Sequence, residues 1–251
     1  MAFLRPIKVT LAGCALGMLA ASAMAAPPAP AAPPPPASVQ LDRAQIEGLI
    51  RAYLLDNPEI IPEAMQRLEE RQRNESVAEL RAQLEKPFEG AWIGNPEADV
   101  VVVEFFDYAC GYCRRMAGDI ERLVAEDSKV KIVFREFPIL GPGSVEAART
   151  ALQAARSGGY TQFHRDIFAA GPLTKASLQK VAKKGKIKLP KDMTALDAEL
   201  SANRRMARQL GINGTPAFII AGRFVSGAIG YDGLKEQVAA ARAAAAKAAP
   251  K

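Results

Sequence analysis

Residues 100–116 read VVVVEFFDYACGYCRRM, and this stretch determines the expected fold. The β-branched and aromatic run from Val100 to Phe106 is typical of a buried central strand. Two cysteines follow directly, helical periodicity then extends over Gly111–Glu126, and a second strand is predicted at Val130–Phe134. The segment is therefore predicted to be a βαβ unit whose cysteines lie at the junction of strand and helix.

The spacing of the two cysteines predicts redox chemistry. At the start of a helix, the first sulfur of a CxxC pair is exposed to unpaired backbone N–H groups and to the helix dipole, which stabilise a thiolate. Cys110 is therefore the predicted nucleophile, with a lowered pKa, and Cys113, one turn inside, is the predicted resolving thiol. A disulfide across two residues constrains little chain entropy, so reactivity explains the pair better than stability does.

Half of a metal site is the main alternative for a single CxxC pair. A structural zinc site normally needs two further Cys or His ligands, and the sequence does not supply them at compatible spacing. The single histidine, His164, lies in a helical region and is interpreted as a structural or surface residue. No metal is firmly predicted, but a linear Cu(I) site at Cys110 and Cys113 remains open because soft thiolates suit that ion. The expected redox group is otherwise the disulfide of the pair itself.

The N-terminus has the pattern of a secretory signal. Two basic residues precede an apolar run over Val9–Ala21, and Ala23-Met24-Ala25 is a typical cleavage pattern. We predict a signal peptide at 1–25 and export to the periplasm. The run is shorter than the roughly 20 apolar residues of a membrane-spanning helix. Lipidation at Cys14, which follows a lipoprotein-like Leu-Ala-Gly, is the less favoured alternative.

Composition and charge exclude several classes of protein. With 251 residues and 49% hydrophobic residues, the chain can bury a sizeable core, so a mostly disordered protein is excluded. The net formal charge of +6 falls to +4 without residues 1–25, which hold two basic and no acidic residues. A lysine cluster has no neighbouring aromatic series, so we expect a solvated helix end and no nucleic-acid partner. Its members are Lys180, Lys183, Lys184, Lys186, Lys188 and Lys191.

Two segments precede the catalytic region. Residues 26–37 are almost entirely Pro and Ala, which predicts an extended linker. Residues 38–87 carry apolar residues at helical spacing, interrupted at Asp56-Asn57-Pro58, which predicts a short helix followed by a longer one. The apolar stripe along each predicted helix offers too little apolar surface for the segment to fold alone. The stripes either dock on the chain's own catalytic domain or, as we favour, drive self-association. Their members are Ile46, Leu49, Ile50, Tyr53, Leu54, Ile61, Met65, Leu68, Val77, Leu80 and Leu84.

Residues 88–251 form the predicted catalytic domain. An all-helical insertion is predicted at about 144–210, followed by a short hairpin and a closing helix. The predicted helices of the insertion are Val145–Ala155, Tyr160–Ala169, Lys175–Lys184 and Met193–Leu210. The predicted hairpin strands are Ala217–Ile220 and Arg223–Val225, and the closing helix is Tyr231–Ala245.

Two stretches together resemble the DsbA-type branch of the thioredoxin superfamily: VVEFFDYACGYCRRM at 102–116 and GINGTPAFII at 211–220. The resemblance covers about Gly90 to Ala245 and implies an α/β thioredoxin fold with an all-helical insertion. It also implies that Glu104 is a buried acid that accepts the proton of Cys113 during disulfide transfer.

The resemblance extends to the loop before the hairpin. It implies a cis peptide bond between Thr215 and Pro216, placed against the active-site disulfide, where the backbone pairs with an extended substrate strand. Gly111 and Tyr112 stand where DsbA has Pro-His, and Thr215 stands where it has valine. We therefore predict that Thr215, Pro216, Gly111 and Tyr112 bind substrate and that the pair is less oxidising than that of DsbA. Thr before the cis-proline is shared with bacterial disulfide isomerases.

The stretch YLLDNPEIIPEAM at 53–65 resembles the N-terminal extension of the suppressor-of-copper-sensitivity C (ScsC) type. That resemblance implies a homo-oligomer, with a trimer favoured, and disulfide shuffling. The leading hypothesis is an exported disulfide isomerase or reductase that acts on unfolded or misoxidised secreted proteins. A membrane-bound, ScsB-like thiol reductase would keep it in the dithiol form. A monomeric DsbA-like dithiol oxidase and a Cu(I)-binding copper-tolerance protein remain the alternatives.

Overall fold

The computed structural model describes residues 42–248. The predicted signal peptide at 1–25, the linker at 26–37 and the alternative of lipidation at Cys14 lie outside these residues. The chain divides into two compact units between Tyr53 and Leu54. Within the described range, no helix is long and apolar enough to cross a membrane.

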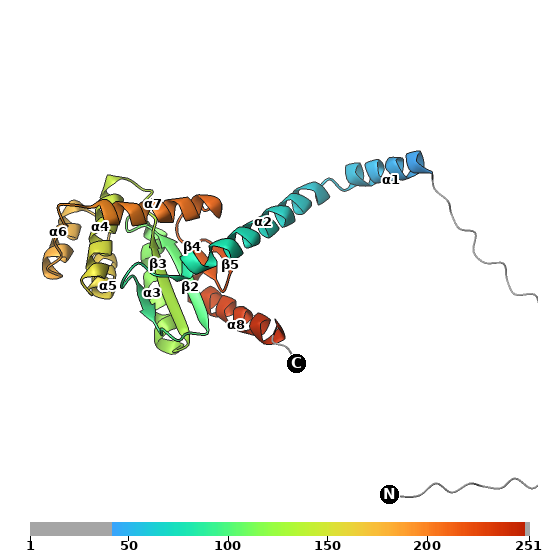
Figure 1. Cartoon of the computed structure of the whole chain (residues 1–251). Coiled ribbons are helices and arrows are strands. Elements are labelled where there is room, and N and C mark those ends of the chain that lie inside the picture. Colours follow the sequence, from blue (N-terminus) through green and yellow to red (C-terminus); the bar gives the residue numbers. More distant parts are fainter. Residues whose placement is uncertain (1–41, 249–251) are drawn as a thin grey trace, which may run out of the picture. The chain divides into compact units, whose positions relative to one another are not determined.

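A mixed sheet of five strands, in the order β1-β3-β2-β4-β5, forms the centre of the second unit (Figure 1). β2 (Val100–Phe106) runs parallel to β3 (Val130–Glu136) and antiparallel to β4 (Ala217–Ile220). The outer strands β1 (Trp92–Gly94) and β5 (Arg223–Ser226) are antiparallel to their neighbours. The sequence predicted four of these strands and missed β1, which is too short for its periodicity to be recognised.

Helices cover both faces of this sheet, which explains why β2 is apolar at every position except Glu104. Val102 and Phe106 belong to the core beneath α3 (Gly111–Glu126) and α8 (Gly230–Ala248). The alternate residue Phe105 belongs to a second core on the opposite face, beneath α2 (Ile60–Glu85) and α7 (Thr194–Gln209). The resulting βαβ unit, with α3 between β2 and β3, has the architecture that the sequence predicted.

Four helices lie between β3 and β4 and form the predicted all-helical insertion (Figure 1). Their bounds are α4 (Pro142–Arg156), α5 (Tyr160–Ala169), α6 (Lys175–Lys184) and α7 (Thr194–Gln209). The bounds agree with the predicted helices to within three residues. The fold is therefore the predicted α/β thioredoxin fold with a helical insertion, preceded by helices.

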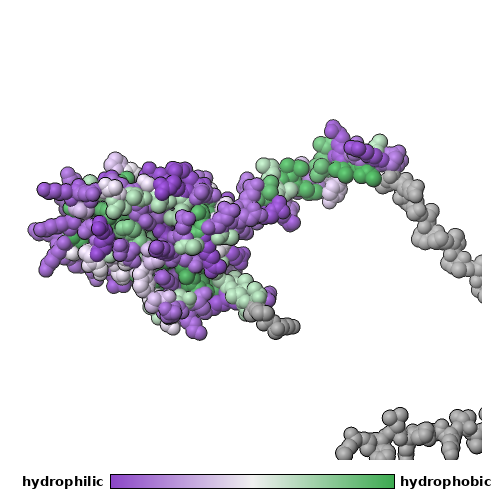
Figure 2. Space-filling model, viewed as in Figure 1, coloured by the Kyte–Doolittle hydropathy of each residue, from purple (hydrophilic) through white to green (hydrophobic). Residues whose placement is uncertain are grey.

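The break predicted at Asp56-Asn57-Pro58 separates α1 (Arg43–Asp56) from α2. The apolar residues of the two helices differ in burial. Several remain exposed, and Figure 2 shows apolar surface on α1 and on the first part of α2. These residues are Ile46, Leu49, Ile50, Tyr53, Leu55, Ile61, Met65 and Leu68, each at least 43% exposed.

The end of α2, in contrast, belongs to the core of the thioredoxin unit. Val77, Leu80 and Leu84 are buried against β2, β3 and β4. The buried Arg135 of β3 fixes the end of this helix, because its guanidinium donates to the carbonyl oxygens of Gln83, Leu84 and Lys86. The last part of the predicted segment 38–87 therefore packs on the sheet, and the exposed large apolar side chains of that segment all precede it. Periodicity along a helix does not reveal which partner covers each turn.

Candidate active site

Cys110 lies at the N-cap position of α3, after the short turn that follows β2, and is 6% exposed. Its Sγ donates to the carbonyl oxygen of Thr215 at 3.3 Å, although 105 residues separate the two in sequence. The bond between Thr215 and Pro216 is cis. The fold thus brings the first cysteine and the loop before β4 together at one edge of the sheet.

The two thiols have opposite acidities. Burial acts to raise the pKa of Cys110, but hydrogen bonds at Thr215, and then at Cys113 and Tyr112 in the first turn of α3, outweigh it and hold the pKa below its ordinary value. The Cys113 side chain is 1% exposed, and burial, followed by the nearby Glu104 carboxyl, raises its pKa far above the ordinary value. At neutral pH, Cys110 is therefore the more nucleophilic sulfur and Cys113 holds its proton.

Glu104 is buried beneath these thiols. Its side chain is 2% exposed and lies on β2 between Phe134 of β3 and Phe218 of β4. Burial, and next the charge of Cys110, raise the pKa of Glu104 to about 8. Within residues 42–248 no hydrogen bond to its carboxyl group is found. A carboxyl group with this pKa and no fixed partner can take up or release a proton near neutral pH.

Asp107 shapes the loops around the thiols, and the sequence did not single it out. One carboxylate oxygen accepts from the backbone N–H of Ala109 at 2.7 Å, and the other accepts from those of Ile139 and Leu140 at 2.8 and 2.9 Å. Its side chain is 1% exposed. Asp107 therefore ties the turn before Cys110 to the loop after β3. An Asp directly after a buried strand was the only available signal.

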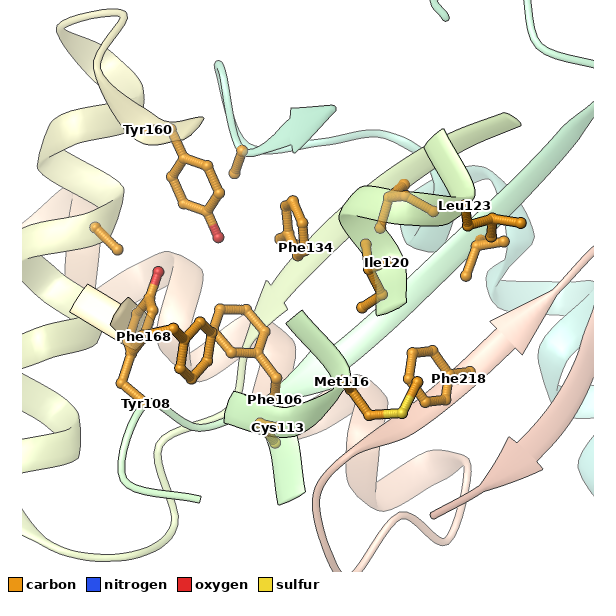
Figure 3. Close-up of a cluster of buried hydrophobic side chains, with 14 of the residues drawn as sticks. Phe106, Tyr108, Cys113, Met116, Ile120, Leu123, Phe134, Tyr160, Phe168 and Phe218 are labelled. Atoms are coloured by element: carbon orange, nitrogen blue, oxygen red, sulfur yellow. The ribbon is translucent and has the colours of Figure 1, made fainter. Parts of the chain in front are cut away.

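A second polar cluster lies beyond this loop. The hydroxyl groups of Tyr108 and Tyr160 point toward each other in Figure 3, and both donate to the Glu136 carboxyl, at 3.3 and 2.9 Å. The Tyr108 hydroxyl also lies 3.1 Å from Nδ1 of His164. Burial raises the pKa of Glu136 well above its ordinary value and lowers that of His164 to about 3. His164 is thus a neutral, buried residue, in agreement with the structural interpretation.

The predicted substrate-binding residues Gly111 and Tyr112 form the start of α3. Tyr112 is 58% exposed, and the guanidinium of Arg115 lies 4.4 Å above its ring. On the other side of the active site, a cleft of about 230 Å³ lies between Ala109 and Leu178, with Leu140 and Leu173 in its wall. The surroundings of Cys110 therefore combine exposed apolar groups with arginines.

Among the described residues, no group of three or more His, Cys, Asp or Glu side chains could hold a metal ion. A linear Cu(I) site needs only the two thiolates of Cys110 and Cys113, so this prediction is not tested by that result.

Two family models match the chain. A model described as "Thioredoxin" matches residues 88–240, and one described as "Copper resistance protein ScsC N-terminal domain" matches residues 42–75. The first covers more than half of the chain, from the residues before β1 into α8. The second covers α1 and the first part of α2, which hold the exposed apolar residues.

Solved structures are similar over the same regions. A linker-deleted variant of Proteus mirabilis ScsC is 28% identical, with a TM-score of 0.69 over 82% of this chain and 99% of that one. A thioredoxin-like oxidoreductase from Silicibacter pomeroyi is 39% identical, with a TM-score of 0.58 over 61% and 91%. The thiol-disulfide exchange protein α-DsbA2 from Wolbachia pipientis is 26% identical, with a TM-score of 0.62 over 67% and 95%.

Curated relatives include much longer proteins. The Na(+)/H(+) antiporter NhaA 3 of Salinispora tropica is 29% identical over 164 residues, which are 61% of this chain and 24% of that protein. NhaA 1 of a Mycobacterium species (strain KMS) is 35% identical over 79 residues, which are 30% of this chain and 13% of that protein. The chain spans about a quarter or less of the length of these relatives.

The family models, the solved structures and the paired thiols beside a cis-proline loop agree. The predicted resemblance is confirmed. The chain belongs to the thioredoxin family and is similar to proteins of the ScsC and DsbA type.

Proposed function

We propose that this protein is an exported disulfide isomerase or reductase that acts on misoxidised envelope proteins through Cys110 and Cys113. The observation that carries the proposal is the contrast between the thiols. Cys110, with a lowered pKa, lies against Thr215, and Cys113, with a raised pKa, is buried over Glu104. A pair of this kind attacks with one sulfur and keeps the other in reserve.

The chemistry proceeds in two steps. The Cys110 thiolate attacks a client disulfide, its S–S bond breaks, and one client sulfur leaves as a thiolate that takes up a proton. For isomerisation, the free client sulfur attacks another client disulfide as a thiolate. The thiolate released in that exchange attacks the mixed disulfide, which forms a new client disulfide and frees the Cys110 thiolate. For reduction, Cys113 passes its proton to the fraction of Glu104 that is ionised near neutral pH and attacks the mixed disulfide. That S–S bond breaks, the client sulfur leaves as a thiolate, and two electrons pass from the dithiol to the client.

Thr215, Pro216, Gly111 and Tyr112 are proposed to bind the client chain. They frame Cys110 from two elements, the loop before β4 and the first turn of α3. An extended client strand that pairs with the backbone at Thr215 would present its disulfide to the exposed side of Cys110. The absence of a histidine between the two cysteines is proposed to make the pair less oxidising than that of DsbA, and Thr215 is proposed to tune its reduction potential.

Self-association through α1 and the first part of α2 is proposed to favour isomerisation. The apolar residues of these helices stay exposed in the single described chain, and a homotrimer would bury them. Several Cys110 sites would then face one client, and the effective concentration near a held client would be high. Export, a periplasmic location and a membrane-bound reductase as electron donor belong to the same proposal. A periplasmic thioredoxin-like protein from Salmonella is among the similar structures.

The alternatives are a monomeric dithiol oxidase and a Cu(I)-binding protein. The second is favoured by one observation, the match of residues 42–75 to the N-terminal domain of a copper resistance protein. Tight Cu(I) binding without activity on scrambled disulfides would support it.

The test compares refolding of a scrambled disulfide substrate by two variants with matched charge. Ile61→Glu with Met65→Glu places two carboxylates on the exposed apolar surface and leaves the buried end of α2 untouched. Ala78→Glu with Ala82→Glu adds the same charge at the same spacing, at exposed positions outside the apolar surface, and is the control. We expect the first variant to become monomeric and to lose isomerisation while it keeps dithiol oxidation, and the control to behave as the unchanged protein.

Equal refolding by both variants would contradict the link between assembly and isomerase activity. In the same assay, Cys110→Ser should abolish exchange, whereas Cys113→Ser should accumulate mixed disulfides with the client. Preferential trapping by the Cys110→Ser variant would reverse the assignment of the two thiols.

A further inference from the structure

Two arginines follow Cys113 directly and return toward the nucleophile. Helical side chains incline toward the N-terminus of their helix, so residues three and four positions after Gly111 lie over the first turn of α3. An ideal Cβ at Gly111 would lie 3.9 Å from Nη2 of Arg114 and 4.0 Å from Nη1 of Arg115. Both guanidinium groups therefore converge on the residue next to Cys110.

Neither guanidinium is neutralised. Among residues 42–248, the guanidinium groups of Arg114 and Arg115 form no ion pair within 4.0 Å and no hydrogen bond, although Arg122, on the same helix, pairs with Glu126 at 2.8 Å. Asp119 is one turn after Arg115 and does not pair with it. The Arg115 guanidinium instead lies 4.4 Å above the exposed ring of Tyr112, a cation–π contact that holds it at the first turn.

The other charges near Cys110 do not offset these arginines at the surface. Glu104 and Asp107 are 2% and 1% exposed and lie inside the fold. Glu146 lines the cleft on the far side of Ala109, together with Lys175. Cys110 itself is only 6% exposed, so the surface beside it carries the two guanidinium groups in addition to the positive end of the α3 dipole.

We propose that Arg114 and Arg115 select disulfides that carry carboxylates beside the reactive sulfurs. This inference rests on the proposed function and specifies its substrate class. A guanidinium binds a carboxylate through paired donors, so the arginines attract an anionic disulfide and hold it over Cys110. They also stabilise the thiolate that leaves when the Cys110 sulfur displaces it. The carboxylates belong either to acidic polypeptide segments or to small anionic thiol compounds, which share this chemistry.

The experiment uses the reduced full chain and three small disulfides of different charge. Glutathione disulfide is anionic, bis(2-hydroxyethyl) disulfide is neutral and cystamine is cationic. The test variant is Arg114→Gln with Arg115→Gln. The control is Arg204→Gln with Arg205→Gln, a matched consecutive pair on α7, which packs on the opposite face of the sheet. The apparent second-order rate constant for each disulfide is measured at low and high salt.

We expect the test variant to reduce glutathione disulfide about fivefold more slowly relative to the neutral disulfide, and cystamine no more slowly. In the unchanged protein, high salt should remove most of the preference for glutathione disulfide over the neutral disulfide. The control variant should keep all three rates. An equal loss for all three disulfides, or an equal loss in the control variant, would overturn the proposal, because the arginines would then not discriminate by substrate charge.

Two disulfide-linked model peptides, one flanked by glutamates and one by lysines, distinguish the two sources of carboxylates. A preference for the glutamate peptide that the test variant loses identifies polypeptide segments. The same loss for glutathione disulfide alone identifies small compounds. A chain that reduces none of these disulfides refutes the proposed function. A chain that reduces the neutral disulfide without any charge preference refutes only this inference.

Discussion

Glu104 and Glu136 lie on adjacent strands and on the same face of the sheet, yet their surroundings differ. In the register of β2 and β3, Glu104 is opposite Phe134, and Glu136 is opposite Phe106. Both are at most 2% exposed, and burial is the first cause of the raised pKa of each. Burial alone therefore does not separate a structural acid from one that exchanges protons.

Hydrogen bonding separates them. Oε1 of Glu136 accepts from two tyrosine hydroxyls, so its protonated form is held in a fixed polar cluster. Glu104 has no such donors in the described part of the chain, and its pKa depends next on the charge of Cys110. Protonation of Glu104 is thereby coupled to the state of the thiols, whereas no thiol is among the causes that shift the pKa of Glu136. The region under α3 is built for proton exchange, and the region under the helical insertion is built for rigidity.

The largest effect should come from removing the Glu136 side chain. Glu136→Ala would leave a cavity and would remove the acceptor that the buried hydroxyls of Tyr108 and Tyr160 share, so we expect a loss of about 4 kcal/mol in the free energy of unfolding. Glu136→Gln keeps a neutral acceptor and should lose about 1 kcal/mol. Denaturant unfolding of the reduced protein measures both. A small loss for the alanine variant would show that the cluster is not a structural support.

This contrast between the glutamates was only half visible in the sequence. Glu104 precedes Cys110 by six residues on a strand that periodicity identifies, so it could be named from its position. Glu136 comes together with Tyr108, 28 residues earlier, and Tyr160, 24 residues later, across three elements. These three residues come together only through tertiary packing, and no local sequence pattern predicts that they do.

In the remainder of the fold, too, features with a local sequence pattern could be predicted and features made by tertiary contacts could not. The sheet core, α3 and the insertion helices carry strong periodicity and were predicted. The three-residue edge strand β1 carries none. The division of α2 into an exposed part and a docked part depends on Arg135, a strand residue about 50 positions away that caps the helix end. The arginines beside Cys110 follow the motif directly in sequence, and their missing acidic partners became apparent only in three dimensions.

The second effect concerns Glu104 and has a defined pH dependence. The folded protein keeps a proton on Glu104 up to pH about 8, whereas the unfolded chain releases it above the ordinary pKa of 4.5. The folded state therefore binds more protons across this window, and stability falls as pH rises through it. Glu104→Gln removes the buried charge. At pH 7 we expect the reduced variant to be more stable by as much as about 3 kcal/mol, with the gain disappearing below pH about 4.5.

Denaturant unfolding of both proteins at a series of pH values checks this, and the difference between the curves cancels the contribution of Glu136. The same variant should release trapped client more slowly, because Cys113 loses its proton acceptor. Parallel stability curves for the variant and the unchanged protein would show that Glu104 is not the group that titrates.

The smallest effect should come from single tyrosine hydroxyls, and it sharpens the separation of the two regions. Tyr160→Phe removes the 2.9 Å hydrogen bond to Glu136 and keeps the ring. We expect a loss of about 1 kcal/mol in the free energy of unfolding, because Tyr108 still donates to the same oxygen. Thiol exchange rates and the pH dependence contributed by Glu104 should stay unchanged, since Tyr160 contacts neither thiol. Stopped-flow exchange with a neutral disulfide, together with unfolding of the Tyr160→Phe and Glu104→Gln double variant, measures this. If the two substitutions are not additive in stability, or if Tyr160→Phe slows exchange as much as Glu104→Gln does, the two glutamates act as one network and the contrast between them is wrong.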